Sequence, residues 1–419
     1  MERFNPWWRR EPDEVAEEWL GAPVRWFPEE VSSLSLQPFS LNFLSGPRQV
    51  GKTTGVKLLV AELLKARQPE SIFYFSCDEL SDHKELGEVL DAYLASASAR
   101  AIKGRLIFLD EVTFVDDWWR AVKARIDDGS LKGDAVTVTG SVSLELLKQR
   151  ERFPGRRGRG VDVTMRPRSF GQYVEALNGP HVVGAESLRE AGTALAGNTM
   201  YGETLSGLLQ DYLQTGGFPG SIIEMKERGR VGEATVKTLL DWLRADWAKA
   251  GRSDRYMKEV LAYILRARGT PVSWLGMARE TSIGSPHTTQ AYVETLEGLL
   301  VALVLELLTP QGKMMHRRNK EVHFADPLAY RAFSAFSGVQ VDEAALVEGV
   351  VASHLSRRWE TYYWKDGTEV DAVVREDGRE VGVETKWGFR KGFRPRHLAS
   401  AYISLDRRTV PLFLASLKL

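Results

Sequence analysis

The chain has 419 residues, and its length predicts two or three domains with sizeable cores. Hydrophobic residues make up 43% and charged residues 27%, which is typical of a soluble globular protein rather than a disordered or membrane protein. Lysine plus arginine equal aspartate plus glutamate at 56 each, so any nucleic-acid surface must be local. The single cysteine, Cys77, excludes an internal disulfide framework and a cysteine-rich zinc site. Since no signal peptide and no apolar run of roughly 18 residues is recognisable, we expect a cytoplasmic protein without a membrane span.

Strand and helix patterns alternate in the first part of the chain. Residues 41–44 form an apolar run that leads into a glycine-rich loop, and a helical pattern follows the loop. Further strand-like runs occur at residues 71–76, 105–109 and 135–139, with helical patterns between them. This alternation predicts a parallel β-sheet covered by helices.

In the rest of the chain the predicted secondary structure changes several times. From residue 169 onwards helical patterns dominate, and from about residue 256 a helix, a helix-turn-helix and an apolar β-ribbon follow in order. Asp377-Gly378 separates two strand patterns and is a strong hairpin signal. We therefore divide the chain into four expected domains: an α/β core at 1–168, a helical lid at 169–255, a winged helix at 256–324 and a second α/β domain at 325–419.

A phosphate-binding loop follows the first expected strand. The pattern G-x-x-x-x-G-K-[ST] is matched by Gly46, Pro47, Arg48, Gln49, Val50, Gly51, Lys52 and Thr53, with Thr54 next to it. Glycines let the backbone amides and the helix N-terminus face phosphate oxygens. Lys52 would bring a positive charge to the β- and γ-phosphates, and the Thr53 hydroxyl would ligate magnesium. The loop predicts ATP and Mg²⁺ as cofactors.

Two carboxylates end the strand-like run at residues 105–109. Asp110 would position the magnesium ion, and Glu111 would act as the catalytic base that polarises the attacking water. An ordinary strand end with solvated acids is the alternative, but an intact phosphate loop argues against it.

The stretch from Lys148 to Arg168 is basic. Between these two residues lie Arg150, Arg152, Arg156, Arg157, Arg159 and Arg166. Three interpretations stay open for it: a solvated face, an arginine finger that reaches a neighbouring subunit, and a surface that contacts nucleic-acid phosphates.

Several motifs in order resemble those of the prokaryotic, especially archaeal, AAA+ ATPases that carry a C-terminal domain of restriction-endonuclease-like fold. The matching stretches are residues 46–54, 109–112, 139–141, 154–156, 167–170 and 215–219. The resemblance implies an α/β fold with a P-loop AAA+ parallel sheet, a helical lid, a winged helix and a nuclease-like tail. It makes Arg156 the candidate finger of a homo-oligomer, and it makes Thr139 or Ser141 the candidate sensor of the γ-phosphate.

The tail carries residues that resemble the PD-(D/E)xK nuclease signature. With a two-residue turn at Asp377-Gly378, paired residue numbers sum to 755, which places Asp371 opposite Glu384. Strict alternation then puts Glu369, Asp371, Glu384 and Lys386 on one face, and Val370, Ala372, Val374, Val381 and Val383 on the other.

Two carboxylates this close repel each other unless a positive charge lies between them. A divalent cation held by Asp371, Glu384 and Glu348, with Lys386 as the residue that orients water, would remove that repulsion. The alternative is a solvated amphipathic hairpin in which Glu369 pairs with Lys386. Cleavage does not follow from the signature alone, because such folds also serve as binding modules.

The expected winged helix gives mixed signals for DNA binding. Its recognition helix at 286–300 contains Glu294 and Glu297 but no lysine or arginine, which disfavours phosphate contacts. Basic residues gather instead near the wing, at Lys313, His316, Arg317, Arg318 and Lys320. Three functions remain, in this order: an ATPase acting on DNA with a nuclease-like tail, a nucleotide-switched regulator, and a protein remodeller.

Overall fold

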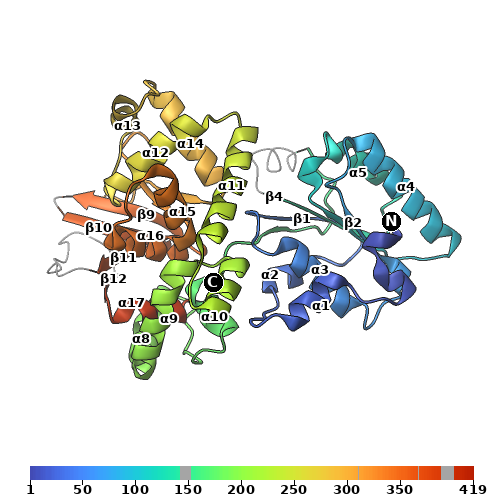
Figure 1. Ribbon diagram of the computed structural model, residues 1–419, viewed down its shortest axis with the longest axis horizontal. Helices are drawn as coiled ribbons and strands as arrows, with labels where there is room; N and C mark the ends of the chain where they lie inside the picture. The colour runs from blue at the N-terminus through green and yellow to red at the C-terminus, as the bar shows by residue number, and fades with distance from the viewer. Residues whose placement is uncertain (142–151, 310, 367, 388–400) are drawn as a thin grey trace. The chain divides into compact units, whose positions relative to one another are not determined.

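The computed structural model describes residues 1–141, 152–309, 311–366, 368–387 and 401–419 (Figure 1). The chain divides into two compact units, Met1–Arg166 and Pro167–Leu419. In the described residues no helix is long and apolar enough to cross a membrane. Short 3-10 helices lie at Glu2–Phe4 (η1), Pro6–Arg9 (η2), Pro69–Ser71 (η3), Val112–Phe114 (η4) and Thr199–Tyr201 (η5).

Unit 1 is built on a parallel five-stranded sheet, as the alternation of strand and helix patterns predicts. The strands are β1 (Ser40–Gly46), β2 (Ile72–Ser76), β3 (Leu106–Asp110), β4 (Ala135–Ser141) and β5 (Asp162–Thr164). Their order is β2-β3-β4-β1-β5, and every neighbouring pair is parallel. The sequence patterns missed only β5, because three residues are too few to show a period. Since parallel strands end at the same edge, the loops after β1, β3 and β4 come together there.

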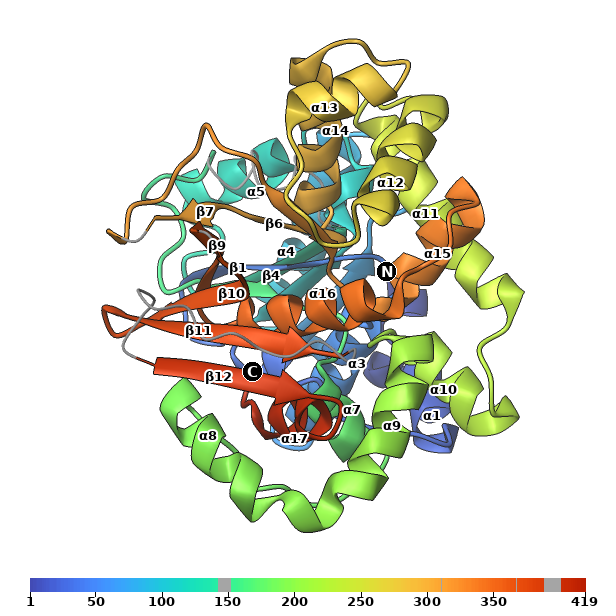
Figure 2. The ribbon, with the colours of Figure 1, turned by 90° about the vertical axis from the view of Figure 1, so that its left-hand side faces the viewer.

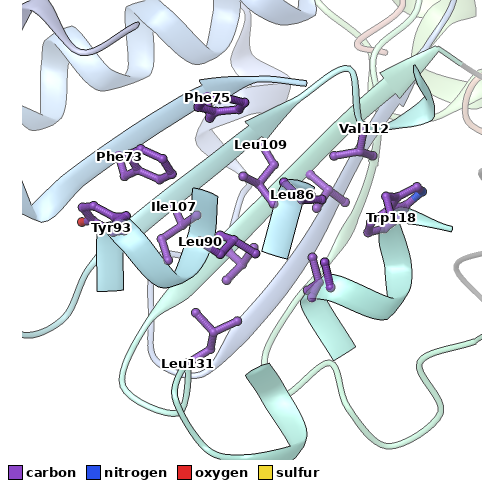
Figure 3. Close-up of a cluster of buried hydrophobic side chains, with 14 of the residues drawn as sticks. Phe73, Phe75, Leu86, Leu90, Tyr93, Ile107, Leu109, Val112, Trp118 and Leu131 are labelled. Atoms are coloured by element: carbon purple, nitrogen blue, oxygen red, sulfur yellow. The ribbon is translucent and has the colours of Figure 1, made fainter. Parts of the chain in front are cut away.

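Helices cover both faces of this sheet. They are α1 (Glu14–Gly21), α2 (Glu29–Ser32), α3 (Lys52–Leu63), α4 (His83–Ala99) and α5 (Trp118–Asp127). The helices α4 and α5 pack against each other and share one hydrophobic cluster with alternate residues of the strands (Figure 3). In it the Phe73 and Tyr93 rings stack with centroids 4.2 Å apart. Because these side chains are buried, the cluster stabilises the carboxyl ends of β2 and β3.

Unit 2 begins with a run of helices. These are α7 (Phe170–Ala176), α8 (Leu188–Gly197), α9 (Gly202–Thr215), α10 (Pro219–Arg228) and α11 (Glu233–Lys249). The turn between α9 and α10 requires glycine, because a Cβ atom on Gly216 would lie 1.8 Å from Oδ1 of Asp326. A Cβ atom on Gly217 would lie 2.1 Å from the carbonyl oxygen of Arg168. The helical pattern after residue 169 is therefore confirmed, whereas its role as a lid stays a prediction.

A three-helix segment and a β-ribbon follow. The helices are α12 (Asp254–Ala267), α13 (Trp274–Glu280) and α14 (Pro286–Gly298), and β6 (Ala302–Leu305) pairs antiparallel with β8 (Glu321–Phe324). The short strand β7 (Leu307–Leu308), between them in sequence, joins a different sheet. The element order is the one expected, and the winged-helix assignment remains a prediction.

The end of unit 2 contains the second sheet. Its strands β9 (Glu360–Asp366), β10 (Thr368–Glu376), β11 (Arg379–Lys386) and β12 (Ala401–Asp406) join β7 in the order β12-β11-β10-β9-β7. The helices of this part are α15 (Pro327–Ser337), α16 (Glu343–Leu355) and α17 (Thr409–Ser416). Figure 2 shows α16 alongside β10 and β11, and α16 contacts both strands.

The β10–β11 hairpin has the predicted turn and register. Asp377 and Gly378 both have positive φ, 48° and 73°, as a two-residue turn of this kind requires. The paired residues run from Ala372 and Val383 to Glu376 and Arg379, and each pair sums to 755.

Strict alternation along β10 is wrong, however. The pairing with β9 shifts between Val370 and Val373, so that two residues of β10 oppose one residue of β9. This bulge brings Val370 and Val373 into one hydrophobic cluster with Trp364. The prediction that Val370 shares a face with Ala372 and Val374 therefore fails, and the side chain of Glu369 lies outside the described residues.

Candidate functional site

The phosphate loop connects β1 to α3 in unit 1. Gly46 ends β1, and a Cβ atom there would lie 2.1 Å from the carbonyl oxygen of Met165. Gln49 and Gly51 have positive φ of 64° and 94°, so the backbone curls before Lys52 starts the helix. The other residues of the motif lie along the same curve: Pro47, Arg48 and Val50 in the loop, and Thr53 and Thr54 in the first turn of α3. Amide groups at such a turn and helix start form an anion-binding concavity.

Lys52 is buried beneath this loop with only 4% of its surface exposed. Its ammonium group donates to the carbonyl oxygens of Gly46 and Pro47 at 3.1 and 3.0 Å. It also lies 3.7 Å from Oε1 of Glu111. A buried ammonium that is held by the loop's own carbonyls is placed where phosphate oxygens would replace those acceptors.

Asp110, at the end of β3, accepts hydrogen bonds from three hydroxyl groups. Thr53 and Tyr74 donate to Oδ2 at 2.7 and 2.6 Å, and Thr139 donates to Oδ1. The carboxylate is 2% exposed. The structure thus brings together the loop residue and the strand-end acid that the sequence assigned to magnesium, although 57 positions separate them.

Glu111 follows directly in a left-handed conformation with φ of 52°, which is unusual for a residue with a side chain. Its backbone amide donates to Oγ1 of Thr139, and its Oε2 atom accepts from the amide of Ser141 at 3.3 Å. The Ser141 hydroxyl lies 3.5 Å from that of Thr113. Both sensor candidates therefore lie at the same edge as Glu111, with Thr139 bonded to Asp110 and Ser141 beside Glu111.

The arginines of the basic stretch contact partners within unit 1. Nε of Arg156 donates to Oδ1 of Asp127 at 2.6 Å, and the guanidinium of Arg157 pairs with Asp162 at 2.6 and 2.9 Å. Arg152 stacks over the Trp119 ring at 4.6 Å, and Arg159 donates to Gln37. Lys148 and Arg150 lie outside the described residues. The Arg156 side chain is 35% exposed, so it is held at the surface by one carboxylate.

The candidate carboxylates of unit 2 share a cavity of about 950 Å³. Glu348 lines it from α16, Asp371 from β10, and Glu384 with Lys386 from β11. Two buried residues of β8, Glu321 and His323, line the same cavity. The structure therefore gathers all four residues that the resemblance implied.

Two of the cavity carboxylates have partners within the chain itself. Oδ2 of Asp371 accepts from the amide of Thr385 at 2.7 Å, and Lys386 forms an ion pair with Oε1 of Glu384. The other oxygen, Oε2 of Glu384, is buried and has no hydrogen-bond partner among the residues that the structure describes. In the described residues, no three His, Cys, Asp or Glu side chains are arranged to hold a metal. Lys386 thus pairs with Glu384, whereas the alternative pair of Glu369 with Lys386 involves a side chain outside the described residues.

The basic residues near the ribbon differ in their surroundings. His316 and Lys320 contact the carboxylate of Glu306 at 2.9 and 3.1 Å, and Lys320 is buried. Arg317 and Arg318 are exposed, as is Lys313. The exposed cationic surface of this segment is therefore smaller than its sequence suggests.

Sequence reasoning missed two features of these sites. The first is Tyr74, whose hydroxyl bonds to Asp110 although the residue reads as an ordinary strand aromatic. The second is the pair of β8 residues, Glu321 and His323, whose side chains face the cavity of the nuclease-like hairpin. A buried acid and a histidine two positions apart in an apolar strand were the available signal for the second feature.

Comparisons with known proteins agree with the first site. A family model described as "AAA domain" matches residues 39–174, which contain the phosphate loop, Asp110, Glu111 and the five parallel strands. This part of the chain is therefore an α/β AAA domain. No curated protein matches the chain.

Three solved structures are similar to the chain at low sequence identity. They are the Aeropyrum pernix ORC2 protein in its ADPNP-ADP complexes, at 13% identity, the Aeropyrum pernix ORC1 protein in complex with DNA, at 14%, and the Thermotoga maritima RuvB Holliday junction branch migration motor, at 15%. The aligned parts cover 77%, 71% and 73% of this chain and 91%, 86% and 90% of those chains. The TM-scores are 0.42, 0.30 and 0.27.

Proposed function

We propose that unit 1 binds ATP with Mg²⁺ and hydrolyses it. The observation that carries this proposal is the 2.7 Å hydrogen bond from Thr53 to Asp110, next to a buried Lys52 within the phosphate loop. These residues fit the group, because magnesium prefers oxygen ligands and usually keeps several waters. Bound nucleotide would supply the reactive γ-phosphoryl group, and magnesium would neutralise charge on it.

Each residue then has a distinct task. Lys52 would exchange its carbonyl acceptors for phosphate oxygens, while Thr53 and Asp110 would hold the metal. Glu111 lies 3.7 Å from Lys52 and would orient the attacking water once that ammonium is engaged by phosphate. Arg156 would reach the nucleotide of a neighbouring subunit in a homo-oligomer, after it leaves Asp127.

Two variants test this function. Lys52→Ala should weaken ATP binding and abolish hydrolysis, whereas Glu111→Gln should retain ATP binding and stop turnover. Binding is followed by calorimetry, and hydrolysis by phosphate release. If both variants hydrolyse ATP at the wild-type rate, the chemistry does not take place at this loop.

We further propose that the cavity of unit 2 takes part in metal-dependent cleavage of nucleic acid, with DNA as the first substrate to test. Two observations support this proposal. One cavity is lined by Glu348, Asp371, Glu384 and Lys386, and a buried oxygen of Glu384 has no hydrogen-bond partner in the described part of the chain. Magnesium or manganese would have to displace Lys386 from Glu384, and the freed ammonium would then be available to orient water.

A binding role is the second candidate for this tail, with ATP state as its switch. It is favoured by the ion pair of Glu384 with Lys386 and by the backbone bond to Asp371, which give these two carboxylates partners from the chain itself. ATPase and nuclease assays on one preparation, with and without DNA, separate the candidates. Stimulation of hydrolysis by DNA supports action on DNA, whereas tight ATP binding with negligible turnover supports a regulator or remodeller.

A further inference from the structure

The free edge of the unit 1 sheet is covered by the segment Met1–Asp13. Strand β2 lies at this edge, so Ile72 and Tyr74 turn backbone groups away from the sheet. The Asn5 side chain satisfies both groups of Tyr74: its Oδ1 accepts from the amide at 2.7 Å, and its Nδ2 donates to the carbonyl oxygen at 2.9 Å. Asn5 is fully buried, so this side chain replaces a neighbouring strand at one position.

Two tryptophans extend the same contact. The indole nitrogens of Trp7 and Trp8 both donate to the carbonyl oxygen of Ile72, at 3.2 and 3.0 Å. The Trp8 ring stacks on Phe73 and Tyr93 with centroids 6.1 and 6.0 Å away. The segment is thus bonded to two alternate residues of β2 and packed against the hydrophobic cluster beside them.

The segment is also bonded to α3, the helix that carries Thr53. Lys57 of α3 donates to Oδ2 of Asp13 at 2.7 Å and to the carbonyl oxygen of Phe4 at 3.2 Å. Its ammonium group lies 3.8 Å from the centre of the Tyr74 ring. Burial lowers the pKa of Lys57, and the hydrogen bond with Asp13 opposes that change. One segment therefore connects α3 and β2, the two elements that carry Thr53 and Tyr74.

Tyr74 links this segment to the expected nucleotide site. Its hydroxyl donates to Oδ2 of Asp110 at 2.6 Å, the same oxygen that accepts from Thr53. A tyrosine phenol is protonated at neutral pH, so this hydroxyl acts as the donor. When Thr53 turns to a metal ion, the Tyr74 hydroxyl would still fix the orientation of the carboxylate.

We propose that Met1–Asp13 and Tyr74 together position the Asp110 carboxylate for magnesium, with Tyr74 as a positioning residue of the nucleotide site. The inference rests on the proposed ATP site and names a part of the chain that no phosphate-loop motif includes. Loss of the Tyr74 hydroxyl should weaken magnesium binding in the nucleotide complex without weakening the contacts between the loop and the phosphates. Groups that orient a metal ligand typically change metal affinity about 10-fold or more when removed.

The test separates the metal from the nucleotide. A fluorescent ATP analogue is bound to full-length protein in EDTA and at increasing Mg²⁺ concentrations. Tyr74→Phe should need about 10-fold more Mg²⁺ for half-maximal effect, with unchanged affinity in EDTA. Tyr93→Phe is the matched control, because the Tyr93 hydroxyl donates to the carbonyl oxygen of Glu70 and not to Asp110.

A second pair of variants tests the segment itself. Asn5→Ala removes both bonds to Tyr74 and should raise the Mg²⁺ requirement as well. Arg3→Ala removes an exposed ion pair with Glu79 and a contact with the Phe4 ring, but no bond to β2, and should not. Thermal unfolding checks that each variant is folded. An unchanged Mg²⁺ requirement in Tyr74→Phe overturns the inference, whereas absence of nucleotide binding in the wild-type protein overturns the proposed function.

Discussion

Thr53 and Asp110, one at the start of α3 and the other at the end of β3, are joined by a hydrogen bond of 2.7 Å between Oγ1 and Oδ2. Strand β4 lies between β1 and β3, so the bond spans the edge at which the three strands end. Thr139 of β4 donates a hydrogen bond to the other oxygen of Asp110, Oδ1. Each oxygen of this buried carboxylate is therefore fixed by hydroxyl groups from flanking elements.

The first prediction concerns the Thr53 hydroxyl. Thr53→Ala should reduce ATP turnover at least about 10-fold, because a direct metal ligand is lost, and excess Mg²⁺ should restore part of the rate. Thr53→Ser keeps the hydroxyl and serves as the control, with turnover near that of the wild type. Phosphate release measured over a range of Mg²⁺ concentrations checks the prediction. Equal Mg²⁺ dependence in Thr53→Ala and Thr53→Ser would contradict it.

A second prediction concerns Arg156 and a neighbouring subunit. Because a finger acts mainly on charge in the transition state, Arg156→Ala should lower kcat by about 10³-fold and change nucleotide affinity little. Arg159→Ala, an exposed arginine three positions away, is the control and should keep its activity. The oligomeric state is measured by sedimentation on the same samples. A fully active monomer would remove the need for a finger from another subunit.

The positions of the phosphate loop and of Asp110 could be predicted from the sequence, because each depends on a local pattern. A strand, a glycine turn and a helix start within residues 40–53 leave little freedom for Lys52, and an apolar run fixes Asp110 at a strand end. The role of Tyr74 could not be predicted, because its hydrogen bond to Asp110 depends on which strands are neighbours. The periodicity of a sequence does not encode the order of strands in a sheet.

In the C-terminal hairpin, too, local features could be predicted from the sequence and features that depend on a neighbouring strand could not. A two-residue turn sets the register, so the pairing of Ala372 with Val383 followed from counting alone. The bulge between Val370 and Val373 depends on the facing strand β9, and a pattern of alternating residues contains no sign of an extra residue. The ion pair of Glu384 with Lys386 could not be predicted either, because it depends on the side-chain rotamers of both residues.

The third prediction is a pH dependence of unit 2. Burial lowers the pKa of His354 to about 3 and that of His323 to about 4. The unfolded chain therefore binds more protons than the folded one below pH 6.5, so these two groups reduce stability as pH falls. Burial raises the pKa of Asp326 to about 6. At this group, below about pH 6, the folded chain therefore binds more protons than the unfolded chain. Between about pH 4 and 6 these three groups together give a net difference of about one proton, and they should make unit 2 less stable as pH falls.

Urea unfolding between pH 4.5 and 7 checks this balance. His354→Gln removes one titrating group, although the imidazole Nε2 atom that accepts from the amide of Phe170 is lost as well. In the His354→Gln variant, the free energy of unfolding should fall less steeply as pH falls, by the equivalent of about one proton, whatever the absolute stability of the variant. Asp326→Asn should make the slope steeper. Identical slopes in all three proteins would mean that these buried groups do not set the acid response.

The last prediction concerns competition between Lys386 and a metal ion in the unit 2 cavity. Lys386 already pairs with Oε1 of Glu384, so a divalent cation must displace the ammonium group to reach that oxygen. Lys386→Ala should therefore tighten Mn²⁺ binding measured by calorimetry, yet it should remove cleavage because no group is left to orient water. Asp371→Ala should weaken Mn²⁺ binding about 10-fold or more and also remove cleavage.

Both variants should hydrolyse ATP like the wild type, because the phosphate loop belongs to unit 1. Glu380→Gln, near the turn of the same hairpin, is the control and should leave Mn²⁺ binding unchanged, since Glu380 contacts Arg375 and is not among the described residues that line the cavity. Cleavage is followed on single-stranded, double-stranded and branched DNA and on RNA. If wild-type protein binds no Mn²⁺ and cuts none of these substrates, the paired Glu384 and Lys386 are part of a binding surface, and a nucleotide-switched binding protein becomes the leading function.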